Sequence, residues 1–99
     1  MTAQIDIPRD EIAAFCRRHH IKRLALFGSV LRDDFRPDSD VDVLVEFEPG
    51  HTPGFAFFRM EQELSEIIGR KVDLNTRGFL GQSILDNVLR EAEPVYGEA

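Results

Sequence analysis

The 99-residue chain has a single cysteine, Cys16, and this scarcity excludes two kinds of architecture. One thiol cannot form an intramolecular disulfide, and no cysteine-based metal site is visible. The sequence also has no apolar run near the roughly 18 residues that a membrane span requires. Its N-terminus lacks the apolar core of a signal peptide. We therefore expect a cytoplasmic protein that does not associate with membranes.

Positive charge is also scarce. The chain carries 12 Lys and Arg residues against 18 Asp and Glu residues, which gives a formal net charge of -6 at pH 7. Because phosphate backbones attract basic patches, this balance argues against a general nucleic-acid-binding surface. The acidity suits a basic protein partner, although moderate acidity is more often a simple solubility feature.

Length and composition define the size of the fold. With 42% hydrophobic and 30% charged residues, the composition is ordinary for a globular protein. A chain of 99 residues can bury one core and leaves little room for a second substrate-binding module. We predict a single domain over residues 1–99.

Hydrophobic periodicity predicts the order helix, strand, strand, helix, strand, helix. The predicted helices cover residues 6–20, about 53–68 and 82–91; the predicted strands cover 21–27, 41–47 and 71–75; and residues 94–96 form an extended tail. This order predicts a two-layer α/β (α+β) fold. In that fold, helices pack on one side of a small mixed sheet of three to four strands, and the strand over 41–47 is central.

Local signals place the helix ends and the buried stripes. Asp6 or Ile7 is expected to cap the first helix, and Thr52 the second. Phe55 and Phe58 lie partly off the apolar stripe of the second helix, so they belong either to the core or to a partner surface. The final helix is expected to bury Ile84, Leu85, Val88 and Leu89.

Two aspartates open the strand over 41–47. Asp40 and Asp42 are two residues apart, so their side chains project from the same face. Carboxylates this close repel each other unless a cation neutralises them, and Mg²⁺ prefers oxygen ligands. Asp73 joins the same face if its strand is a neighbour, and three carboxylates can hold two metals roughly 3.5–4 Å apart. The alternative is that Asp40 and Asp42 are ordinary solvent-facing residues.

Gly28 and Ser29 end the first predicted strand, before a single helical turn at residues 30–32. The glycine allows a ligand to approach the backbone closely, the serine supplies a hydroxyl, and the helix start offers N–H donors. The pair is therefore suited to a phosphate site. The simpler alternative is a strand-to-helix turn in which Ser29 is the N-cap.

The combination of these motifs is more specific than its parts. Gly28-Ser29, ten intervening residues and then Asp40-x-Asp42 resembles the signature of the DNA polymerase β-like nucleotidyltransferase superfamily. The flanking segments are similar to the minimal nucleotidyltransferase (MNT) family, the MntA-type antitoxins. These segments read LFGSVLRDDFRPDSDVDVLVEF and PGHTPGFAFFRMEQELSEIIGRKVDL. The resemblance extends from about residue 23 to residue 96.

The resemblance implies a role for each matching residue. Gly28 and Ser29 would hold the nucleoside triphosphate. Asp40 and Asp42 would bind the Mg²⁺ ions. Asp73 would complete the metal-binding triad and assist deprotonation of the attacking hydroxyl.

Arg32 matches a position that is commonly basic in the family. The resemblance implies that it steadies phosphate. A local ion pair with Asp33 or Asp34 is an equally good explanation of its position.

The resemblance also implies an activity and a partner. Family members pair with a HEPN-domain RNase toxin and are similar to protein adenylyltransferases, which move AMP from ATP to a tyrosine of that toxin. A homodimer is compatible with this interpretation. Two alternatives stay open: an antitoxin that neutralises its partner by binding alone, and nucleotidyl transfer to a small molecule. The second is less favoured, because such relatives generally have an additional domain.

Overall fold

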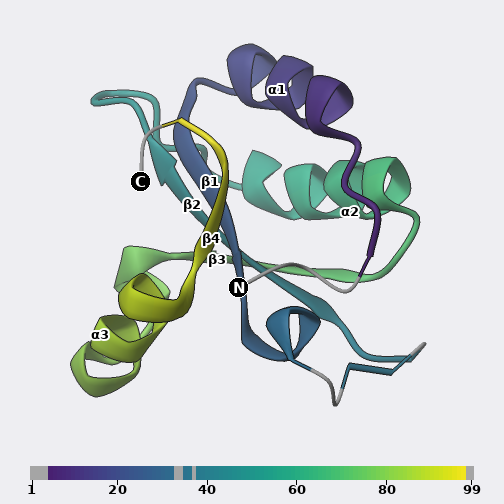
Figure 1. The fold of residues 1–99 in the computed structure, drawn as a ribbon. Coiled ribbons are helices and arrows are strands. Elements are labelled where there is room, and N and C mark those ends of the chain that lie inside the picture. Colours follow the sequence, from purple (N-terminus) through teal and green to yellow (C-terminus); the bar gives the residue numbers. More distant parts are fainter. Residues whose placement is uncertain (1–4, 33–34, 37, 98–99) are drawn as a thin grey trace.

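The computed structural model describes residues 5–32, 35–36 and 38–97, which form an α/β domain with three helices and four strands (Figure 1). In chain order the elements are α1 (Arg9–Arg18), β1 (Ile21–Phe27), the 3₁₀ turn η1 (Gly28–Leu31), β2 (Val41–Phe47), α2 (Ala56–Ile68), β3 (Val72–Thr76), the 3₁₀ turn η2 (Arg77–Phe79), α3 (Gln82–Glu91) and β4 (Glu93–Tyr96). None of the helices within these residues is long and apolar enough to cross a membrane.

The four strands form one mixed sheet in the order β3-β2-β1-β4. Strand β1 is antiparallel to both β2 and β4, whereas β2 and β3 run parallel. The predicted fold class is confirmed. The segment expected to be an extended tail is β4, an edge strand in which Pro94 pairs opposite Ala25. An edge position tolerates proline because one side of the strand needs no ladder hydrogen bonds.

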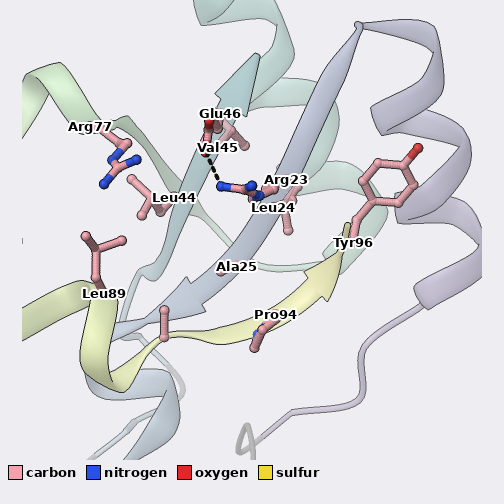
Figure 2. Close-up of a pocket in the computed structure, with 11 residues that line it drawn as sticks. Arg23, Leu24, Ala25, Leu44, Val45, Glu46, Arg77, Leu89, Pro94 and Tyr96 are labelled. Carbon is pink, nitrogen blue, oxygen red and sulfur yellow. Dashed lines mark hydrogen bonds and ion pairs between the residues drawn. The ribbon is translucent and has the colours of Figure 1, made fainter. Parts of the chain in front are cut away.

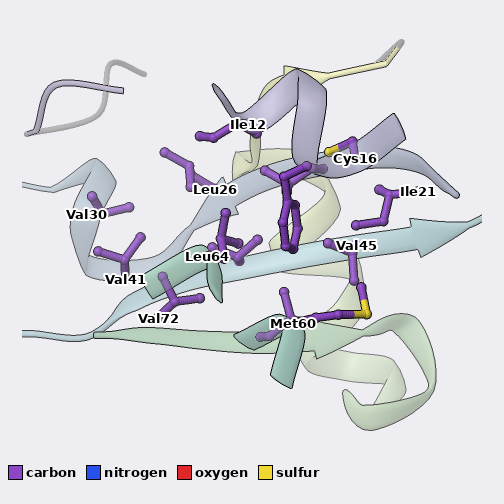
Figure 3. Close-up of a cluster of buried hydrophobic side chains, with 14 of the residues drawn as sticks. Ile12, Cys16, Ile21, Leu26, Val30, Val41, Val45, Met60, Leu64 and Val72 are labelled. Carbon is purple, nitrogen blue, oxygen red and sulfur yellow. The ribbon is translucent and has the colours of Figure 1, made fainter. Parts of the chain in front are cut away.

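Helices α1 and α2 cover one face of the sheet and enclose the main core (Figures 1 and 3). Alternate residues of β2 supply its centre: Val41, Val43 and Val45 are each at most 1% exposed. The helices contribute apolar residues at helical spacing, namely Ile12, Phe15 and Cys16 from α1 and Phe57, Met60 and Leu64 from α2. Burial raises the pKa of Cys16 to about 12, so its thiol serves as core packing.

Helix α3 lies on the opposite face, so the prediction that helices pack on one side holds only for α1 and α2 (Figure 1). Val88 packs there against Phe27 and Leu44 in a small second cluster. The expected burial of Ile84 and Leu89 was wrong, since they are 56% and 45% exposed. The reason is that this face of the sheet carries charged as well as apolar side chains and cannot cover a whole helical stripe.

The predicted helix caps were also wrong. Helix α1 begins after Pro8, and α2 begins after Phe55; neither first turn is capped by a side chain that the structure describes. The backbone satisfies these turns instead. The N–H of Phe57 donates to the Gly54 carbonyl at 3.1 Å, and that of Ile12 donates to the Pro8 carbonyl at 3.0 Å. The hydroxyl of Thr52 is therefore not needed there.

Candidate active site

The parallel pairing of β2 with β3 sets Asp42 directly beside Asp73. Side chains at paired positions of neighbouring strands project from the same face of the sheet, so the two carboxyl groups meet. After burial, repulsion by the Asp73 carboxylate is the next cause that raises the pKa of Asp42, as expected for two acidic groups that lie close together. Asp73 was expected to lie on the same face as Asp40 and Asp42 if its strand were a neighbour of theirs. Because β3 pairs with β2, this requirement is satisfied.

Asp40 stands at the rim of this pair. It precedes β2 and is exposed, yet it is close enough to raise the pKa of Asp42. Among the described residues, the three aspartates do not form a group whose ligand oxygens all lie within 4.8 Å of one another. The structure therefore brings Asp42 and Asp73 together and leaves Asp40 beside them.

The electrostatics of Asp42 suit a cation-binding group. Burial is the main cause that raises its pKa from 3.8 to about 6, and repulsion by Asp73 and then by Asp40 adds to the rise. Arg32 acts in the opposite direction. A divalent cation would reverse this balance, because it favours the ionised form of each carboxylate that it contacts. The donor set of clustered carboxylate oxygens fits Mg²⁺.

This pKa rise predicts a pH dependence of folding. The unfolded chain releases the Asp42 proton near pH 3.8, whereas the folded chain keeps it to about pH 6. The folded state thus binds more protons between these values, and the free energy of unfolding falls as pH rises through that window. We expect Asp42→Asn to remove this fall and to be more stable than the parent chain at pH 8 by roughly 1–2 kcal/mol, less than the full pKa shift implies, because the carboxyl group is only partly buried and solvent screens it.

Urea unfolding of both chains at pH 4 and pH 8, without metal, measures the effect. The relevant quantity is the difference between the chains, since other groups such as Glu63 titrate equally in both. A difference in unfolding free energy that is the same at the two pH values would contradict the prediction.

Gly28 lies against the carboxylate of Asp42. Its φ angle of +78° is one that residues with side chains rarely adopt, and a Cβ at this position would lie 2.3 Å from Asp42 Oδ2. The close approach follows from the sheet, because Phe27 pairs with Asp42 at the end of β1. The glycine is therefore required both by the backbone conformation and by the aspartate that it contacts.

Ser29 is the second residue of η1, not its N-cap. The residue before the turn is Phe27, and within the described chain no side chain caps the turn. The alternative in which Ser29 serves as a cap is therefore wrong. Its hydroxyl is half-buried beside the glycine that contacts Asp42.

Arg32 forms an ion pair with Glu91 at the end of α3, with Nη2 and Oε2 3.3 Å apart. Asp33 and Asp34, the partners considered from sequence, lie outside the described residues. The pair is about half exposed, so its own contribution to stability is small. The pair nevertheless fixes the position of Arg32. Glu91, which is 59 residues away in the sequence, holds the guanidinium near Asp42.

A cavity of about 180 Å³ lies on the same face of the sheet, between the strands and α3 (Figure 2). Its lining is mainly apolar, with an Arg23–Glu46 ion pair of 3.0 Å and the side chain of Arg77 at its edges. None of the three aspartates lines it. Sequence reasoning did not single out this cavity, because β1, β2, β4 and α3 form it only after they are assembled. A second, more open hollow is lined by Asp38, Ser39, Asp40, Gly69, Arg70 and Lys71.

The fold, the paired carboxylates and the glycine turn are those of the nucleotidyltransferase class of proteins. The family model described as the nucleotidyltransferase domain matches residues 9–95. The chain is 37% identical over 75 residues to the protein adenylyltransferase MntA of Thermococcus cleftensis, covering 75% of this chain and 74% of that protein. It is 36% identical over 78 residues to a Methanocaldococcus jannaschii protein assigned as a protein adenylyltransferase, covering 79% and 83%. The chain therefore belongs to the nucleotidyltransferase domain family, among the minimal nucleotidyltransferases of the MntA type.

Solved structures agree with this assignment. One that is assigned as a minimal nucleotidyltransferase is 38% identical, covers 87% of each chain and has a TM-score of 0.73. A toxin–antitoxin complex with AMP-PNP has a TM-score of 0.75 at 19% identity, covering 93% of this chain and 75% of that chain. A complex of a tri-AMPylated HEPN toxin with an MNT antitoxin from Shewanella oneidensis has a TM-score of 0.66 at 18% identity, covering 91% and 70%. The last two show the shared fold alone.

Proposed function

We propose that this chain is a Mg²⁺-dependent protein adenylyltransferase that acts as an antitoxin. It transfers AMP from ATP to a tyrosine of a HEPN-domain RNase toxin. The observation that carries the proposal is the Asp42–Asp73 pair across β2 and β3, with Gly28 against it. The names of the relatives support the activity, and the toxin complexes among the structural neighbours support the partner. A cytoplasmic location, where ATP is abundant, stays a prediction.

In this proposal Asp40, Asp42 and Asp73 hold two Mg²⁺ ions, which supply positive charge to the phosphates when bound. Gly28 presents bare backbone where a side chain would exclude the triphosphate, and the Ser29 hydroxyl donates to a phosphate oxygen. The tyrosine oxygen attacks the α-phosphorus while the bond to pyrophosphate breaks.

The proton from the tyrosine hydroxyl passes to Asp73 in this proposal. Asp73 is exposed, so an acceptor from another protein can approach it. Arg32 is proposed to steady a phosphate, for which it would exchange its half-exposed pair with Glu91 for a stronger contact.

A partner must supply the acceptor, and exposed aromatic side chains indicate where it would bind. Phe55 is 91% exposed and Phe58 is 69% exposed, at the start of α2. This exposure excludes the core, the first of the two roles considered from sequence, and we propose that the two side chains belong to a partner surface. The same observation favours the second candidate function, an antitoxin that neutralises the toxin by contact alone.

The proposal is tested with the purified chain, ATP, Mg²⁺ and the HEPN-domain protein encoded beside it. Mass spectrometry should detect AMP on a tyrosine of that partner. The adduct should be lost when Mg²⁺ is chelated, and when ATP is replaced by α,β-methylene ATP, whose pyrophosphate cannot leave. A partner that co-purifies with the chain yet gains no AMP would contradict the enzymatic proposal and favour binding alone.

A further inference from the structure

Two of the three histidines converge with a glutamate at the end of the sheet away from the aspartates. His20 immediately precedes β1, Glu48 immediately follows β2, and His51 lies in the loop beyond. Because β1 and β2 are antiparallel with Ile21 opposite Phe47, the flanking residues are brought together. One ligand atom from each of the three side chains lies within 4.8 Å of the other two, and in the part of the chain that the structure describes no other set of three does so.

The backbone fixes this cluster. The N–H of Glu48 donates to the His20 carbonyl at 2.9 Å, and the N–H of His51 donates to the Glu48 carbonyl at 3.0 Å. His20 also adopts a positive φ of 57°, which is uncommon for a residue with a side chain. The three Cα positions are thus set by the fold and by two hydrogen bonds, and only side-chain rotations remain free.

The side chains are already close to one another. Nδ1 of His20 lies 3.6 Å from Oε2 of Glu48. The rings of His20 and His51 are stacked, with centroids 3.9 Å apart and planes 18° apart. All three residues are exposed, so small rotations can turn one nitrogen of each ring toward a shared ion without disturbing the core.

We propose that His20, Glu48 and His51 form a surface site for a divalent transition-metal ion of the Zn²⁺ type. Two imidazoles and one carboxylate are a ligand set that Zn²⁺ takes in proteins, and solvent water would fill the remaining position. Imidazole nitrogens select transition metals over Mg²⁺, which prefers oxygen ligands. The site therefore binds a different class of ion from the aspartates.

The site is also separate in space from the aspartates. Asp42 and Glu48 lie six residues apart along β2, which is about 20 Å of strand at roughly 3.3 Å per residue. Asp42 is the second residue of β2 and Glu48 follows its last residue, so the two groups lie at opposite ends of this strand, which Figure 1 labels. Binding here does not depend on the proposed adenylyl transfer, and either proposal can fail without the other.

The test is calorimetric titration of Zn²⁺ into the untagged chain in millimolar Mg²⁺, which competes with Zn²⁺ for carboxylate oxygens. We expect about one equivalent of Zn²⁺ to bind, and His51→Ala to weaken its affinity by at least about tenfold. The matched control is His19→Ala. His19 is next to His20 in sequence, but its Nε2 contacts Glu63 at 3.0 Å, outside the cluster.

Proton NMR of the imidazole rings gives a second readout. The chain has three histidines, and the signal of each can be assigned from its alanine variant. Zn²⁺ should shift the signals of His20 and His51 and leave that of His19 in place. Three results would each overturn the proposal. The first is absence of Zn²⁺ binding, and the second is equal affinity for Zn²⁺ in His51→Ala and His19→Ala. The third is loss of the Zn²⁺ equivalent in Asp42→Asn. Circular dichroism of the metal-free variants checks that they fold.

Discussion

Asp42→Asn should abolish AMP transfer while leaving the fold intact. The substitution preserves the shape of the side chain and removes the charge that a metal ion needs, at the position where β1, β2 and β3 meet. Metal ions supply several kcal/mol of charge stabilisation in such reactions, so we expect a loss of at least about a thousandfold in rate. The rate is measured as AMP incorporated into the partner at saturating ATP and Mg²⁺.

Asp86→Asn is the matched control for this experiment. It makes the same chemical change on the exposed side of α3, where Asp86 contacts Gln82 at 3.1 Å, and it should transfer AMP at the parental rate. The same pair of variants separates catalysis from contact. If Asp42→Asn cannot transfer AMP but still neutralises the toxin fully, binding is sufficient. Undiminished AMP transfer by Asp42→Asn would remove Asp42 from the mechanism.

The parts of the fold that depend on local pattern were predictable from the sequence. The bounds of β1, β2 and α3 agree with the predicted ranges, because strand alternation and helical spacing are properties of consecutive residues. The parts that depend on long-range assembly were not. The pairing of β4 with β1 and the position of α3 on the second face depend on how the elements pack against one another. The residues of β4 or of α3 alone do not determine these contacts.

The same division applies to the candidate site. The period of two placed Asp40 and Asp42 on one face, but only the parallel register of β2 and β3 sets Asp73 beside Asp42. The pairing of Arg32 with Glu91 could not be predicted, since 59 residues separate them in sequence. The cluster of His20, Glu48 and His51 was missed for the same reason, although it flanks two strands that were correctly predicted.

Gly28→Ala should disable the site through a steric clash with Asp42. The new Cβ would lie 2.3 Å from Asp42 Oδ2, so the carboxylate or the turn must move by about an ångström. A displacement of that size can cost about a hundredfold in rate, and we expect at least this loss in AMP transfer. The positive φ of Gly28 adds a separate cost of roughly 1–2 kcal/mol in stability, because L-residues are strained in the left-handed region.

Gly69→Ala separates the two effects. Gly69 ends α2 at φ +79°, nearly the angle of Gly28, but a Cβ there meets nothing within 4 Å. Gly28→Ala should therefore lose at least as much stability as Gly69→Ala in urea unfolding, and only Gly28→Ala should lose AMP transfer and the thermal stabilisation given by Mg²⁺ and ATP. If the two variants transfer AMP equally well, the contact between Gly28 and Asp42 is a feature of strand packing, and the nucleotide must bind elsewhere on this face.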